Sequence, residues 1–256
     1  MKRSWYLNVS PADVGQAAIL VGDPGRAELF AGRLTDARPV TDQRGLRTFT
    51  GFFDGVAITV SAFGMGAPIA AIVLEELAEQ GATVALRAGT AMTLMPDVAI
   101  GSFVVAHAGF RGEGTSLTYA PLGYPAVADL GLTTIAADEL ARRNLPHAVG
   151  VIGSLDGFFT QMFARRPDRV AGVAARLDEL RELNVLAVDM ETAALLVAGS
   201  RLGIGVGAVC LITVDGRDGR ILDESARGAR EGELVEVALH AVTKHVRRVR
   251  TETRRL

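Results

Sequence analysis

Short runs of Val, Ile, Leu and Ala alternate along this chain with longer stretches in which apolar residues recur every three or four positions. The short runs predict strands at residues 18–21, 56–61, 83–86, 103–106, 149–152, 185–188 and 206–213. The longer stretches predict helices at residues 68–80, 132–144, 176–183, 190–202 and 231–250. Strands that are apolar almost throughout need cover on both faces. The sequence therefore predicts a three-layer α/β/α fold with a central mixed, largely parallel sheet.

The composition fits one domain spanning residues 1–256, because no linker, repeat or low-complexity tract divides the chain. Hydrophobic residues make up 49% of the sequence and charged residues 22%, which supports a large core. The same excess predicts surface that is buried between the subunits of a homo-oligomer. The formal net charge of −2 argues against a general nucleic-acid binder.

Several absences in the sequence predict a cytoplasmic protein without a cofactor. Cys210 is the only cysteine, so no internal disulfide can form, and its apolar surroundings favour a packing role. We find no signal peptide after the basic start and no run of about 18 apolar residues that could cross a membrane. The four histidines are far apart in the sequence and lack metal-ligand spacing, so we expect no metal site.

Three arginines beside glycines or turns form the clearest polar signal. Arg26 lies in GDPGR, Arg44 in DQRG and Arg87 in LRAGT, where Thr90 adds a hydroxyl. Guanidinium groups beside free backbone N–H groups are what a small oxyanion such as phosphate needs. GDPGR alone is equally typical of a tight turn, and it has neither dinucleotide nor P-loop spacing. The three loops together predict a phosphate site.

An acidic pair comes directly after the predicted strand at residues 185–188. Asp189 and Glu191 lie on either side of Met190 where this strand runs into a helix. A carboxylate at such a strand end can accept hydrogen bonds from sugar hydroxyls. Together with the phosphate site, it indicates an enzyme that brings phosphate to a sugar.

Six motifs resemble the hexameric nucleoside phosphorylases, the family that includes bacterial purine nucleoside phosphorylase and uridine phosphorylase. They are GDPGR at 22–26, DQRGLRTFTG at 42–51, FGMGAPIAAIVLEEL at 63–77, LRAGT at 86–90, SLTYAPLGYPAVADL at 116–130 and VDMETAALL at 188–196. They run in the family's order from the N-terminus to near the last helix. The resemblance implies a nucleoside phosphorylase-like fold, a hexamer built from dimers, and nucleoside and inorganic phosphate as substrates.

The resemblance also implies a role for each candidate residue. The phosphate ligands would be Gly22, Arg26, Arg87 and Thr90, joined by Arg44 of a neighbouring subunit. The ribose ligands would be Met65, Met190 and Glu191, with Tyr6 of a neighbour in place of the family's usual histidine. The base contacts would be Phe158, Phe159 and Gln161. From the residues alone, the aromatic pair and Met65 could also be core packing, and Asp189 departs from the family's usual glutamate.

The choice of base depends on the end of the last predicted strand and on the residues after it. Purine enzymes of the family protonate N7 with an aspartate there, helped by a later arginine, which points to Asp215 and Arg227. A carboxyl in an apolar strand end could hold the raised pKa that a general acid needs. Asp215 could instead be a turn residue. The arginine that reads uracil in uridine phosphorylases is missing beside Gln161.

These observations favour phosphorolysis of purine ribonucleosides, giving free base and ribose 1-phosphate. Uridine phosphorylase is the main alternative, since SLTYAPLGYPAVADL looks more like that branch. A nucleosidase that uses water is disfavoured by the three arginines, because water needs no anion site. A non-catalytic nucleoside-binding protein could share the fold.

Overall fold

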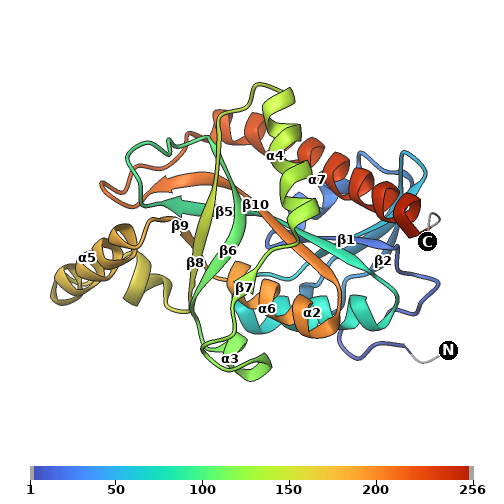
Figure 1. Cartoon of the computed structure of the whole chain (residues 1–256), viewed down its shortest axis with the longest axis horizontal. Helices are drawn as coiled ribbons and strands as arrows, with labels where there is room; N and C mark the ends of the chain where they lie inside the picture. The colour runs from blue at the N-terminus through green and yellow to red at the C-terminus, as the bar shows by residue number, and fades with distance from the viewer. Residues whose placement is uncertain (1–2, 254–256) are drawn as a thin grey trace.

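The computed structural model describes residues 3–253, and its helices and strands alternate as predicted (Figure 1). The strands are β1 (Ala17–Val21), β2 (Thr35–Thr41), β3 (Thr48–Phe53), β4 (Val56–Ala62), β5 (Val84–Thr93), β6 (Phe103–Gly112), β7 (Ala126–Val127), β8 (His147–Leu155), β9 (Val185–Asp189) and β10 (Gly205–Asp215). The α-helices are α1 (Pro24–Ala31), α2 (Ala67–Glu79), α3 (Thr115–Tyr119), α4 (Leu130–Arg142), α5 (Pro167–Glu182), α6 (Thr192–Leu202) and α7 (Glu224–Thr253). Two short helical turns, η1 (Gln43–Gly45) and η2 (Phe158–Met162), complete the chain.

All the strands belong to one mixed sheet, as predicted. Their order is β10-β6-β8-β9-β5-β1-β4-β3-β2, with β7 paired to β6. The neighbours β4, β1 and β5 are parallel, whereas β3 and β2 add an antiparallel edge. Strand β10 pairs with β5 as well as with β6, so that β5, β9, β8, β6 and β10 form a closed ring.

Helices cover both faces of the sheet, which confirms the predicted three layers. Along β1, Ile19 and Val21 pack in a core cluster with α1, α4 and α7, whereas Ala18 and Leu20 pack with α2 and α6. Figure 1 shows α4 and α7 on one side of the sheet and α2 and α6 on the other. Successive residues of a strand point to opposite faces, so an apolar strand serves both cores.

Polar elements depart most from the sequence prediction. The edge strand β2 is largely exposed and carries Asp36, Arg38 and Pro39, so no apolar run signals it. The sequence does not decide whether residues 109–125 form a binding loop or a simple connection. In the structure they contain the end of β6 and all of α3. Arg111 organises this stretch, because its Nη1 donates to the carbonyl oxygen of Tyr124 at 2.6 Å and its Nη2 to that of Ala120 at 2.7 Å.

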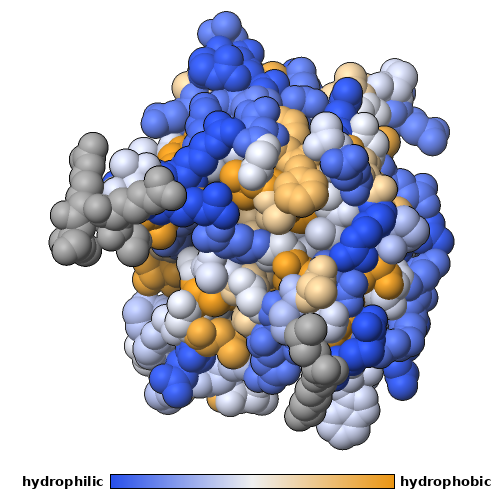
Figure 2. Space-filling model, turned by 90° about the vertical axis from the view of Figure 1, so that its right-hand side faces the viewer, coloured by the Kyte–Doolittle hydropathy of each residue, from blue (hydrophilic) through white to orange (hydrophobic). Residues whose placement is uncertain are grey.

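The surface of the molecule mixes polar and apolar areas. The face in Figure 2 carries several hydrophobic areas separated by hydrophilic side chains. Trp5 is 90% exposed and Met65 84%, which is unusual for large apolar side chains. Within residues 3–253, no helix combines the length and the apolar character needed to cross a membrane.

Candidate active site

A cavity of about 180 Å³ lies where the chain leaves β1, β4, β8, β9 and β10. Its lining includes nine of the residues that the sequence singles out: Gly22, Arg26, Met65, Arg87, Thr90, Phe158, Asp189, Met190 and Glu191. Its lining does not include six others: Tyr6, Arg44, Phe159, Gln161, Asp215 and Arg227. The fold thus gathers the phosphate and ribose candidates of one chain around a single space.

Arg26 approaches the cavity from the first turn of α1. Asp23 caps this helix by accepting a hydrogen bond from the backbone N–H of Gly25 at 2.7 Å. The Arg26 side chain is 4% exposed, and its Nη2 donates to Oε1 of Glu231 on α7 at 2.8 Å. Its buried Nε has no hydrogen-bond partner among residues 3–253. A buried donor of this kind requires an acceptor, which a bound oxyanion can supply.

Arg87 lies between two carboxylates in the middle of β5. Its Nε donates to Oδ2 of Asp189 at 2.9 Å, and its Nη2 donates to Oε2 of Glu191 at 2.6 Å. The side chain is only 4% exposed. Burial acts to lower the pKa of Arg87, but the two carboxylates outweigh it and raise the pKa above its ordinary value. Arg87 is therefore always charged.

Glu191 connects Arg87, a candidate phosphate ligand, to the turn that carries Met65, a candidate ribose ligand. Its Oε1 accepts from the backbone N–H of Gly66 at 2.7 Å, while Oε2 binds Arg87. Burial raises the pKa of Glu191, although Arg87 acts in the opposite direction. The backbone around Met65 turns sharply, since Gly64 and Gly66 have φ of 80° and 103°, values that favour glycine. This turn places the exposed Met65 at the cavity, so core packing does not explain it.

The aromatic pair lies at the surface beside the cavity. Phe158 is 42% exposed and Phe159 44%, which rules out the core-packing interpretation. Their rings meet edge to face at 5.1 Å, and the guanidinium of Arg165 lies 4.4 Å from the Phe159 ring centre. Gln161 turns toward its own backbone, because its Oε1 accepts from the N–H of Gly157 at 2.7 Å. Of these residues only Phe158 lines the cavity.

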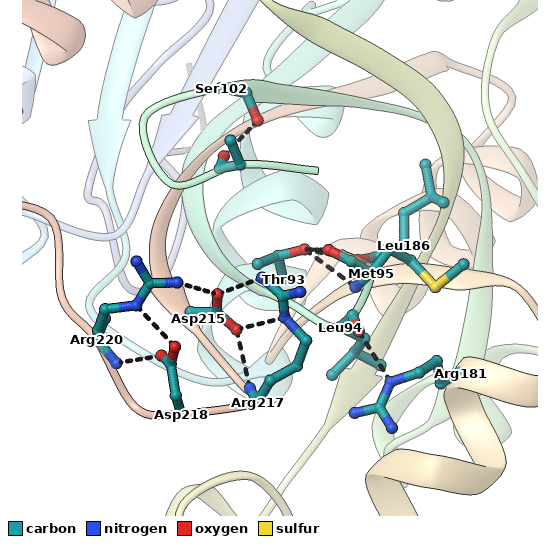
Figure 3. Close-up of polar contacts among 11 residues, drawn as sticks. Thr93, Leu94, Met95, Ser102, Arg181, Leu186, Asp215, Arg217, Asp218 and Arg220 are labelled. Atoms are coloured by element: carbon teal, nitrogen blue, oxygen red, sulfur yellow. Dashed lines mark hydrogen bonds and ion pairs between the residues drawn. The ribbon is translucent and has the colours of Figure 1, made fainter. Parts of the chain in front are cut away.

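The expectation of a raised pKa at Asp215 is wrong. Figure 3 shows a two-point ion pair between Asp215 and Arg217: Nε of Arg217 donates to Oδ1 at 2.9 Å, and Nη2 donates to Oδ2 at 2.5 Å. Arg220 adds a contact of 3.3 Å. Hydrogen bonds from Arg217 hold the pKa of Asp215 below its ordinary value despite burial. The carboxyl is an ionised turn residue, since it also accepts from the backbone N–H of Arg217 at 2.9 Å.

Arg227 does not assist Asp215. It lies on α7, and its Nε donates to Oε1 of Glu231 at 3.0 Å, the same oxygen that binds Arg26. Burial acts to raise the pKa of Glu231, but hydrogen bonds from Arg26 and Arg227 lower it overall. Arg227 therefore belongs to the ion cluster behind the phosphate side and not to the end of β10.

Tyr6 and Arg44 lie together, away from the cavity of their own chain. The Arg44 guanidinium is 5.3 Å from the centre of the Tyr6 ring. Arg44 has φ of 56°, a strained value for a residue with a side chain. Glu76 of α2 fixes the N-terminal segment, accepting from the backbone N–H of Tyr6 at 2.6 Å. The predicted action of both residues in a neighbouring subunit stays a prediction.

Sequence reasoning missed the residues that support the ligands. Ser154 and Thr192 hold Asp189, and Glu231 holds Arg26. Glu231 lies 205 positions from Arg26, within a long polar helix face, so no local signal could have found it. Thr192 directly follows the acidic pair, and its position at a helix start was a usable signal.

Comparison with known proteins decides the family. Residues 16–250 match the family model described as the phosphorylase superfamily. The chain belongs to this superfamily. A uridine phosphorylase of Thermococcus kodakarensis is 32% identical over 240 residues, which cover 93% of this chain and 85% of the relative. A guanosine phosphorylase of Halorubrum lacusprofundi is 32% identical over 248 residues, covering 96% of both chains.

A solved structure extends the match to three dimensions. The uridine phosphorylase of Vibrio fischeri superposes on this phosphorylase superfamily member with a TM-score of 0.87 at 27% identity. The match covers 95% of this chain and 98% of the other. The predicted membership of the nucleoside phosphorylase family is confirmed, and so is the predicted fold.

Proposed function

We propose that this protein cleaves the N-glycosidic bond of uridine with inorganic phosphate, giving uracil and ribose 1-phosphate. The observation that carries the proposal is that Arg26, Arg87 and Glu191 meet in one cavity. Two buried guanidiniums suit an oxyanion, and the adjacent carboxylate suits the hydroxyls of a sugar. The relatives named uridine phosphorylases support the choice of nucleoside.

The phosphate has a reacting role in this proposal. Breaking the bond between sugar and base builds positive charge on the ribose ring, as in glycoside hydrolysis. A phosphate held by Arg26 and Arg87 stabilises that charge and attacks C1′ at close range. Hydrogen bonds from the ribose hydroxyls to Glu191 strengthen as the charge develops. Phosphate, and not water, is therefore the nucleophile that we propose.

The ionised state of Asp215 weakens the case for a purine. Protonation of N7 needs a carboxylic acid that keeps its proton near neutral pH. Arg217 instead lowers the pKa of Asp215, and Asp215 does not line the cavity. With that acid removed, the named relatives favour uridine. The guanosine phosphorylase at 32% identity keeps a 6-oxopurine nucleoside as the second candidate.

We also propose that a neighbouring subunit completes the site, in a hexamer built from dimers. Around the cavity of one chain, the guanidiniums of Arg26, Arg87 and Arg227 are paired with the carboxylates of Asp189, Glu191 and Glu231. These charges balance, so a phosphate anion would find no surplus positive charge. Arg44 from a neighbour would supply it, with Tyr6 beside it.

A direct assay tests the proposed reaction. The protein is incubated with uridine, inosine, guanosine and adenosine, each with and without phosphate, while free base and ribose 1-phosphate are measured. We expect uridine to be cleaved fastest and only with phosphate. Faster cleavage of guanosine or inosine would replace uridine as the substrate. Equal rates without phosphate would make the protein a hydrolase, and no base release from any of the four would contradict the enzymatic proposal.

A further inference from the structure

The carboxylate of Asp189 accepts so many hydrogen bonds from the protein that it has no acceptor site left for a ribose hydroxyl. Its Oδ1 accepts from Oγ of Ser154 at 2.6 Å and from the backbone N–H groups of Glu191 and Thr192, both at 3.2 Å. Its Oδ2 accepts from Nε of Arg87 at 2.9 Å and from the hydroxyl of Thr192. A carboxylate offers about four lone-pair sites. All of them already have protein donors, so none is left for a sugar hydroxyl.

Glu191 differs from Asp189 in this respect. Its Oε1 accepts from the N–H of Gly66 and its Oε2 from Nη2 of Arg87, and the backbone of Met190 also contributes a hydrogen bond to the carboxylate. With fewer protein donors than Asp189, the Glu191 carboxylate keeps acceptor capacity for a ligand. The acidic pair is divided into one carboxylate that can face the sugar and one that is committed to the protein.

The geometry of Arg87 shows what Asp189 secures. Asp189 holds Nε and Glu191 holds Nη2, whereas Nη1 has no hydrogen bond to any residue in the described part of the chain. The guanidinium lies against the bare Cα of Gly89, where an added Cβ would come within 2.1 Å of Nη1. The ring of Phe63 flanks it, with its centre 5.8 Å from Cζ. Two nitrogens of the Arg87 guanidinium, Nε and Nη2, are thus held by carboxylates, and Nη1 can donate to a ligand.

We propose that Asp189 is a positioning residue, which anchors Arg87 through Nε so that its remaining N–H groups are aimed at the phosphate. This assignment rests on the proposed function only in taking phosphate as the anion. Ser154 of β8 and the start of α6 hold Asp189 in turn, so strands β5, β8 and β9 and helix α6 fix one guanidinium together. Asp189 contacts no substrate atom in this arrangement.

Substitution of Asp189 can distinguish a positioning role from a purely electrostatic one, because the two roles predict opposite changes in phosphate affinity. Asp189→Asn removes a negative charge close to the anion, and by Coulomb's law alone it would tighten phosphate binding. If Asp189 acts by positioning, the single amide oxygen of Asn cannot serve both Arg87 and the donors of Ser154 and α6, so its NH2 group faces a donor on one side and the anchoring of Arg87 weakens. Loss of a well-aimed hydrogen bond between charged groups costs on the order of ten- to a hundredfold in binding. We expect phosphate to bind about tenfold more weakly, because part of the loss is offset by the removed negative charge.

The test is calorimetric titration of the intact protein with inorganic phosphate, without nucleoside. Asp189→Asn is compared with Asp189→Glu, which keeps the carboxylate and should stay within about threefold of the unmodified protein. Asp189→Ser is a second variant that keeps an oxygen for the N–H groups of α6 but cannot reach Arg87. Ser154→Ala is a graded variant: it removes one of the bonds that hold Oδ1 and keeps the bond that Arg87 Nε donates to Oδ2, so it should weaken phosphate binding less than Asp189→Asn.

The expected result is weaker phosphate binding in the Asn and Ser variants of Asp189, a smaller loss in Ser154→Ala, and a value near that of the unmodified protein for Asp189→Glu. Unchanged or tighter binding in the Asn and Ser variants would overturn the proposal, and so would an equal loss in Ser154→Ala. In the nucleoside assay, the phosphate KM should rise more than the uridine KM. Phosphate binding without uridine cleavage would contradict the proposed function and leave this inference standing.

Discussion

Gly89→Ala should impair phosphate use although it adds and removes no charge. An added Cβ would lie 2.1 Å from Nη1 and 2.5 Å from Cζ of Arg87, whereas ordinary contact begins near 3.4 Å. The guanidinium would have to move by roughly 1 Å or more, a displacement that can cost on the order of 10²-fold in turnover. Overpacking of this kind also costs about 1–3 kcal/mol of stability.

Kinetics and thermal unfolding together measure both effects. Initial rates at varied phosphate and saturating nucleoside give the phosphate KM and kcat, and thermal unfolding gives the change in stability. Gly172→Ala is the matched control, because nothing lies within 4 Å of a Cβ added there on α5. It should leave the kinetics unchanged and stabilise the helix by about 0.5–1 kcal/mol.

A double-mutant cycle identifies the route of the effect. If the methyl group acts by displacing Arg87, then Gly89→Ala should add little once Arg87→Ala has removed the guanidinium. Additive losses in the double variant would refute the reasoning. An unchanged phosphate KM in Gly89→Ala would refute it as well, since the collision predicted at 2.1 Å would then have no consequence.

Charged groups carry three further expectations. Asp215→Asn should leave uridine turnover within about threefold, since an ionised turn residue is no general acid. Because Arg217 lowers the pKa of Asp215 in the folded protein, the stabilisation by this carboxylate should be present above about pH 4 and lost in acid, which pH-dependent thermal unfolding would show. Mixing equal amounts of Arg44→Ala and Glu191→Gln subunits under conditions of subunit exchange should restore roughly a quarter of the activity, because about half of the dimers are hybrids and each hybrid regains one of its two shared sites. No recovery would mean that Arg44 serves no neighbour. Burial acts to raise the pKa of Glu139 on α4, but hydrogen bonds from Arg142, Lys244 and Arg143 lower it to about 2, so the stability advantage over Glu139→Gln should be complete above about pH 5 and shrink as the pH falls toward 2. An undiminished advantage at pH 2 would contradict this.

The sequence predicted the apolar parts of the fold best. Strand β1 matches its expected bounds within one residue, because its run of apolar side chains has one explanation. Strand β5 was expected to end at residue 86 but continues to Thr93, since the charge of Arg87 is neutralised inside the sheet. The partner carboxylate of Asp189 is 102 positions away in sequence. Periodicity cannot reveal such a pairing, which exists only after folding.

The candidate site shows the same division. Loops that carry glycine beside arginine, such as the one around Arg26, could be recognised because the local pattern contains the chemistry. Asp215 was misjudged although its partner was visible, since Arg217 follows two positions later in a turn. A nearby cation should have predicted a lowered pKa. The pairing of Glu231 with Arg26 had no counterpart in the local sequence.

The closed ring of β5, β9, β8, β6 and β10 limits how this enzyme can move. Arg87 on β5, Asp189 on β9 and Thr213 on β10 all line the cavity, so backbone hydrogen bonds between strands connect the parts of its wall to one another. Two walls joined in this way cannot swing apart about a hinge without breaking a ladder. Entry and exit of nucleoside must therefore depend on segments outside the ring, and both η2, with its exposed Phe158, and the turn that carries the exposed Met65 line the cavity.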